Sequence, residues 1–158
     1  MTPYEVFEAG NVALQCGITL TNARLAYATH GTLNAARDNV IVYPTRYGGN
    51  HADNDFLIGP GMALDPGKYF IVVPNMLGNG VSSSPSNTPI PLAGPDFPAI
   101  TQYDNVMLQE RLLRGALTLG AARPGPTVPV AAWGQVGPVL QLPHRCSAGP
   151  ACRPTDTP

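Results

Sequence analysis

The stretches NVIVY (39–43) and YFIVVP (69–74) decide the fold. Both are continuous runs of β-branched and aromatic residues, which is typical of strands covered on both faces of a sheet. Between them, FLIGPGMAL (56–64) and the turn at 65–68 indicate a short helical or irregular crossover. A crossover between two such strands predicts a right-handed β-x-β unit with the two strands as parallel neighbours.

Two further strand patterns precede this unit. The run VALQCGITL (12–20) has two short apolar pieces around Gly17 and predicts a hairpin. RLAYATH (24–30) alternates apolar and polar residues in part, as a half-buried strand does. We therefore expect a twisted sheet that begins with a hairpin.

One helix is expected from about 102 to 117, packed on one face of this sheet. Thr101 is placed to cap its first turn, and Asp104 lies near the positive end of the helix. Its predicted buried stripe consists of Val106, Leu113 and Leu117, flanked by Leu112 and Ala116. The long segment 77–98 before it predicts a loop, and loops of this length in compact domains are often functional.

The composition changes near residue 120. Residues 121–158 contain eight prolines (124, 126, 129, 138, 143, 150, 154 and 158), and no helical or strand period survives beyond VPVAAW (128–133). Such a segment cannot bury enough apolar area to offset its ordering entropy. We expect a domain over residues 1–119 and a divergent, disordered Pro/Gly-rich tail over 120–158.

Charge and hydropathy exclude several classes of function. The formal net charge is −1, so nothing favours nucleic acid or a membrane surface as a partner. No apolar run approaches the ~20 residues that span a bilayer, and the acidic start lacks the layout of a signal peptide. We expect a cytoplasmic protein. Cys16, Cys146 and Cys152, even with His144 nearby, fit neither a disulfide framework nor a zinc pattern.

Four ordered motifs carry a resemblance to a known family. They are LAYATHGTLN (25–34), LIGPGMALD (57–65), FIVVPNMLG (70–78) and FPAITQYDNV (97–106). Together they resemble the homoserine O-acetyltransferase family of the α/β-hydrolase superfamily, including a branch with general hydrolase or acetyltransferase-like labels. The resemblance implies an α/β class protein with a partial α/β-hydrolase fold and a mostly parallel sheet.

The family's activity is acyl transfer by a serine–histidine–aspartate triad. Its serine takes an acetyl group from acetyl-CoA and passes it to homoserine, an early step of methionine biosynthesis. The resemblance therefore implies a small-molecule acyl donor and acceptor, acetyl-CoA as co-substrate rather than a bound cofactor, and a homodimer. Activation of the serine needs a histidine base and an orienting acid.

The nucleophile position falls in PTVPVAAWGQVGP (126–138), and no serine stands there. Alignment with the family's elbow places Gly134 or Gln135 at the nucleophile, and the next serine is Ser147. We assign no catalytic residue, and we expect a truncation or reading-frame change near residue 120. A non-catalytic binding module and an enzyme that uses unrecognised residues remain as alternatives.

The loop YPTRYGG (43–49) directly follows a predicted buried strand. By resemblance it supplies a backbone N–H to the oxyanion hole, with the Arg46 amide as donor and with Thr45 and Tyr47 as flanking walls. The acetyltransferases proper carry a His-Ala-Leu-Thr-Gly type loop, from which this one departs. The segment 78–84 that follows the next strand is either a loop covering the acyl pocket or a plain surface loop, and its serines are not nucleophiles.

Several other polar residues have structural interpretations. His51, Asp53 and Asp55 lack the spacing and support of a metal site, and we interpret them as a solvated loop or pocket rim. His30 lies on a predicted strand and is interpreted as structural. His144 lies in the tail and is not assigned as the triad histidine.

Overall fold

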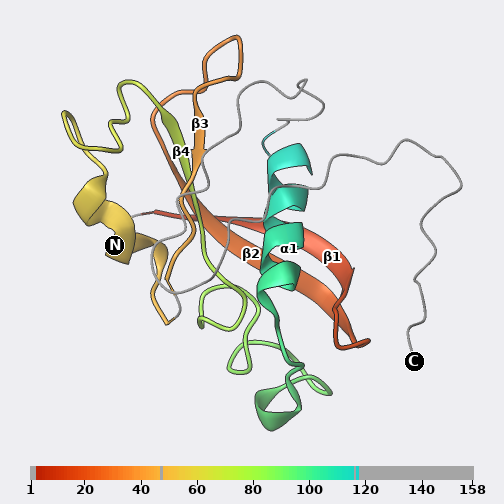
Figure 1. The fold of residues 1–158 in the computed structure, drawn as a ribbon. Coiled ribbons are helices and arrows are strands. Elements are labelled where there is room, and N and C mark those ends of the chain that lie inside the picture. Colours follow the sequence, from red (N-terminus) through yellow and green to blue (C-terminus); the bar gives the residue numbers. More distant parts are fainter. Residues whose placement is uncertain (1–2, 47, 116, 118–158) are drawn as a thin grey trace, which may run out of the picture.

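The computed structural model describes residues 3–46, 48–115 and 117, and residues 118–158 lie outside this description. Four strands form one mixed sheet in the order β1-β2-β4-β3 (Figure 1). The strands are β1 (Glu5–Ala13), β2 (Thr19–His30), β3 (Val40–Val42) and β4 (Phe70–Pro74), and the helices are α1 (Gln102–Gly115) and the short 3₁₀ helices η1 (His51–Leu57) and η2 (Gly94–Asp96).

The two strands that decide the fold are parallel neighbours, as the sequence predicts. Val40 pairs with Phe70 and Val42 with Val72. The predicted α/β class is confirmed, but the described sheet is mixed rather than mostly parallel, because β2 runs antiparallel to both β1 and β4. Apolar runs indicate which strands are buried, but they carry no information on the direction of a neighbouring strand.

The N-terminal hairpin is confirmed and is longer than predicted. β1 begins at Glu5, and the two segments expected around residues 18–20 and 24–30 form one continuous strand, β2. Irregular pairing at Gly10, where φ is 66°, lets β1 bend around the sheet. The half-exposed residues of β1 gave no clear alternation, so the sequence pattern missed its first half.

The helix α1 covers one face of the sheet, and the main core lies between them (Figure 1). Leu108 and Leu112 of α1 are fully buried against Leu25 and Val72 of the sheet. The predicted stripe is therefore partly wrong. Its members Val106, Leu113 and Leu117 are only half-buried, whereas Leu112 is central. Ala116 lies outside the described residues.

The opposite face carries a smaller core under η1 and the crossover. Ile71 and Val73 of β4 are fully buried there, beside Ala28 and Tyr43. Because Val72 points into the main core, β4 is covered on both faces, as its continuous apolar run predicts. The crossover is irregular over 58–64, and its helical turn lies earlier than the predicted 56–64 segment.

The segment 77–98 is a long loop whose one regular element is η2. Among the described residues, no helix has the length and apolarity needed to cross a membrane. The predicted boundary at residue 119 and the tail over 120–158 lie outside the described residues.

Candidate functional site

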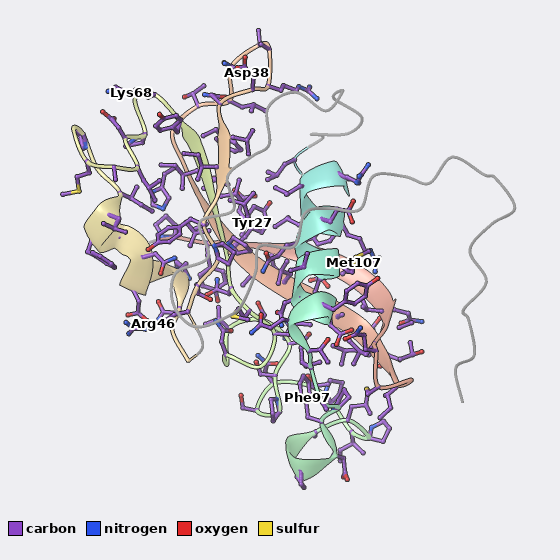
Figure 2. All side chains as sticks on the ribbon, viewed as in Figure 1. Tyr27, Asp38, Arg46, Lys68, Phe97 and Met107 are labelled. Carbon is purple, nitrogen blue, oxygen red and sulfur yellow. The ribbon has the colours of Figure 1, made fainter. Side chains whose placement is uncertain are left out.

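The candidate site begins where β3 ends. Figure 2 shows Asp38 and Lys68, which precede β3 and β4, at one end of the sheet, and Arg46 at the other. The ladder continues beyond β3, because the Tyr43 N–H donates to Val72 C=O (2.8 Å) and the Thr45 N–H to Pro74 C=O (3.2 Å). The loop 43–49 therefore lies at the carboxyl ends of two parallel strands, where ligands bind in open α/β sheets.

Thr45 anchors this loop with both of its polar groups. Thr45 is buried. Its N–H belongs to the ladder, and its Oγ1 accepts a hydrogen bond from the Met76 N–H (3.3 Å). Thr45 thus fixes the loop that follows β3 to the chain that follows β4. Its backbone N–H is already engaged in the ladder.

Arg46 lies at the start of a turn. Its C=O accepts from the Gly49 N–H (3.1 Å) and closes a turn. Within residues 3–46, 48–115 and 117, the Arg46 N–H donates to no protein group. Its side chain is 69% exposed, and an Nη lies 4.0 Å from Asp53 Oδ2, an arrangement that contributes little in solvent. Tyr47 lies outside the described residues.

The turn needs glycine at Gly48, where φ is +74°. A Cβ at Gly49 would lie 2.8 Å from Cγ of the exposed Arg46 side chain, which has room to shift, so the backbone path requires glycine only at Gly48.

A buried asparagine, Asn54, bonds to the start of the loop. The Asn54 side-chain amide in η1 donates to the carbonyls of Tyr43 (3.3 Å) and Pro44 (3.2 Å). Burial also raises the pKa of the neighbouring Tyr43 phenol, which therefore stays uncharged. These contacts fix the direction in which the chain leaves β3.

A second buried asparagine, Asn75, joins the sheet to three segments around the site. It is fully buried, and its Nδ2 donates to Ala26 C=O of β2 (3.1 Å). Its Oδ1 accepts from the His51 N–H (3.0 Å) and from Asn79 Nδ2 (3.1 Å). Asn79 Nδ2 in turn lies 3.1 Å from Gly49 C=O, so this network reaches the end of the turn.

Three of the four serines of the long loop, Ser82, Ser83 and Ser84, are buried, and their hydroxyls bond to the backbone. Ser82 Oγ accepts from the Ala26 N–H (3.0 Å), and Ser83 Oγ accepts from the Arg24 N–H (2.9 Å). Ser84 Oγ accepts from the Gly80 N–H (2.7 Å). Ser82 and Ser83 thus bond to the backbone of β2, and all three hydroxyls are engaged.

The residues of the 50–56 segment do not converge. His51 is buried, with its ring 5.2 Å from that of Tyr4, so it is not part of a solvated loop, but it lines a hollow, as a residue at a pocket rim does. Asp53 is exposed and accepts from the Asn50 N–H in a capping box. Asp55 Oδ1 lies 4.0 Å from Nε2 of His30 at the end of β2. No group of three metal-ligating side chains occurs in the described part of the chain.

The structure brings Thr45 and Arg46 together at the strand ends, but sequence reasoning missed Asn54 and Asn75. Both lie next to predicted elements, and an asparagine directly after a buried strand is a cue that could have identified Asn75. The positions discussed for the nucleophile, Gly134, Gln135 and Ser147, lie outside the described residues, as do His144, Cys146 and Cys152.

Comparison with known proteins supports the resemblance seen in the sequence. No family model matches the chain. It is 46% identical over 112 residues to an ethyl acetate hydrolase from Pseudomonas veronii, covering 70% of this chain and 32% of that protein. It is 37% identical over 142 residues to a homoserine O-acetyltransferase from Chlorobium luteolum, covering 81% of this chain and 39% of the relative.

A solved structure agrees with these relatives. The acetyl esterase MekB matches with a TM-score of 0.72 and 43% identity, over 73% of this chain and 34% of that one. The chain thus spans about a third of the length of the relatives it matches. Over that stretch it is similar to esterases and homoserine O-acetyltransferases of the α/β-hydrolase superfamily.

Proposed function

We propose that this chain supplies the oxyanion loop of an acetyl-ester hydrolase, with the Arg46 N–H as the donor and Thr45 and Tyr47 beside it. The observation that carries the proposal is the Arg46 N–H, which has no partner in the described chain and lies on a loop fixed by Thr45 and Asn54. A donor of this kind acts when negative charge develops on the carbonyl oxygen of a bound ester.

Rigidity is what makes such a donor useful. A preorganised N–H does not have to reorient when the tetrahedral intermediate forms, and removal of one oxyanion donor costs about 10²–10³ in kcat. The ladder bond of Thr45, the Asn54 amide and the link from Asn79 to Gly49 hold the loop at both ends. The polar side chains around it therefore position the amide and take no part in the chemistry.

Ester hydrolysis is favoured over acetyl transfer to homoserine. Identity is higher to the ethyl acetate hydrolase (46%) than to the homoserine O-acetyltransferase (37%). The sequence Pro44-Thr45-Arg46-Tyr47-Gly48 also departs from the acetyltransferase loop. Acetyl transfer from acetyl-CoA to homoserine, in methionine biosynthesis, is the alternative.

The proposal includes inactivity of this chain by itself, since its sequence offers no serine at the expected elbow. The full chain is incubated with p-nitrophenyl acetate, with acetyl-CoA plus homoserine, and with a fluorophosphonate probe. We expect no turnover and no labelling. Turnover that the fluorophosphonate abolishes would contradict the inactivity.

The donor role is tested in a chimera. Residues 3–117 of this chain replace the matching segment of the Pseudomonas veronii hydrolase, and ethyl acetate hydrolysis is measured. Arg46→Pro removes the N–H and is expected to lower kcat by about 10²–10³ with little change in KM. Arg46→Ala keeps the N–H and serves as the matched control. Equal losses in both variants, or faster acetylation of homoserine than hydrolysis, would overturn the proposal.

A further inference from the structure

A hollow of about 350 Å³ lies beside the candidate site and shares η1 and the long loop with it, but it does not include the Arg46 loop. It is lined by β1, β2, the start of η1 and the long loop, chiefly through Tyr4, Val6, Arg24, Asn50, His51 and Val81. Val6 pairs with Ala26, and side chains alternate along β2, so Arg24 and Val6 share the sheet face of Ala28. This is the face opposite α1. The volume of the hollow is at the lower end of the range for small-molecule pockets.

Arg24 provides the positive charge of this hollow. Its backbone is fixed, since its N–H donates to Ser83 Oγ and its C=O accepts from the Ser83 N–H. Its guanidinium forms no ion pair within the described residues. Glu8 lies opposite Arg24 in the β1–β2 register, and it is the acidic group nearest to Arg24 along that pairing. A guanidinium of this kind favours a carboxylate, which it can bind with two parallel hydrogen bonds.

The other walls are held in place. Asn50 lines the hollow, and because its Oδ1 is engaged by the Ala52 N–H, the donor that its side chain can offer is the NH₂ group. The His51 ring is buried between Tyr4 and the side chain of Asn75. Val6 and Val81 add apolar surface. One cation, one amide donor and two aliphatic side chains suit a monoanion with a short apolar chain better than a phosphate.

We propose that this hollow binds a short-chain aliphatic monocarboxylate, with the carboxylate on Arg24 and Asn50 and the chain against Val6 and Val81. The site is separate from the Arg46 loop and does not depend on the proposed ester hydrolysis. Because Arg24 is exposed to solvent, binding is expected in the millimolar range, on the order of 1–10 mM.

The test uses the full 158-residue chain labelled with ¹⁵N and titrated with sodium butyrate at constant ionic strength. We expect saturable shifts of the Arg24 Nε–H and Asn50 side-chain NH₂ resonances. Butyramide, the neutral analogue, and inorganic phosphate are titrated in parallel and are expected to bind at least about fivefold more weakly, because only butyrate combines charge and chain.

Three variants separate the site from general electrostatics. Arg24→Gln is expected to weaken butyrate binding at least about fivefold. Glu8→Gln removes the competing carboxylate and is expected to strengthen it. Arg114→Gln removes one charge from α1 and is expected to leave the affinity for butyrate unchanged.

Absence of saturable shifts, phosphate or butyramide binding as tightly as butyrate, or equal affinities in Arg24→Gln and Arg114→Gln would overturn the proposal. If Arg24→Gln does not fold, Glu8→Gln decides, and unchanged affinity in that variant is then the overturning result.

Discussion

The hydroxyl of Ser82 occupies the place of a strand partner for Ala26. Its Oγ accepts from the Ala26 N–H (3.0 Å) and donates to Asn75 C=O (3.2 Å), and all three residues are buried. β4 ends at Pro74, opposite Tyr27, whereas β2 extends further in the direction of Arg24. The serines of the long loop therefore complete the edge of β2 where β4 has ended.

The first prediction concerns the hydroxyl of Ser82, which takes the place of a neighbouring strand. Ser82→Ala leaves a buried N–H and a buried C=O short of a partner, at an expected cost of about 1–3 kcal/mol in the free energy of unfolding. Ser86→Ala, at an exposed position of the same loop, is the control and is expected to stay within about 0.5 kcal/mol. Urea unfolding of the three proteins checks this, and equal midpoints would contradict it.

The second prediction concerns the anchoring of the candidate oxyanion loop. Thr45→Val keeps the shape of the side chain but removes the acceptor of the Met76 N–H, so we expect a loss of about 1 kcal/mol and faster hydrogen exchange at Met76. Thr45→Ser retains the hydroxyl and is expected to restore slow exchange. Thr32→Val, on an exposed turn, is the control. Unchanged exchange in Thr45→Val would show that this bond does not hold the loop.

Part of this architecture could be predicted because it depends on local sequence. The apolar runs around Ile41 and Val72 identified two buried strands, and the crossover between them identified their parallel pairing. The prediction that Thr101 caps α1 is confirmed, since its Oγ1 accepts from the Asp104 N–H (3.2 Å). The two strands and the cap are each identified by residues close together in the chain.

The remainder depends on partners distant in sequence. The inward face of α1 is set at its first turn, where Asn105 Oδ1 accepts from the Leu77 N–H (2.8 Å) and Asp104 accepts from the Gln15 N–H (2.9 Å). These bonds turn Leu108 rather than Val106 into the core, although hydropathy alone favoured Val106. Asn75 was missed for the same reason, because a polar residue is stable in a core only if tertiary partners satisfy it.

The third prediction tests a close approach at the end of β2. Gly31 has φ +79°, and a Cβ there would lie 2.1 Å from Tyr69 O and 2.5 Å from Pro66 O. Gly31→Ala is expected to cost about 1–2 kcal/mol for the left-handed backbone plus about 1–3 kcal/mol for the clash. Gly10→Ala shares the positive φ but meets nothing within 4 Å, so it measures the backbone cost by itself. Thermal unfolding compares the two variants. Equal losses of stability would mean that the backbone at Pro66 and Tyr69 shifts away from the added methyl group.

The last prediction concerns pH and Asp104. Burial of this carboxyl opposes its ionisation, but hydrogen bonds from Thr101 and from the Gln15 N–H outweigh burial and lower its pKa. Because the folded-state pKa lies below the unfolded value of about 3.9, ionised Asp104 stabilises the fold above that pH. This stabilisation is lost as the pH falls through the folded-state pKa.

We therefore expect Asp104→Asn to be less stable than the parent chain at pH 7 and to lose less stability on acidification below about pH 4. Asp96→Asn removes an exposed carboxylate from η2 and is the control. Urea unfolding of each protein at pH 7 and at several values down to about pH 2.5 gives the slopes. Parallel slopes for the parent and Asp104→Asn would mean that the bond between the hairpin turn and α1 does not depend on the charge of Asp104.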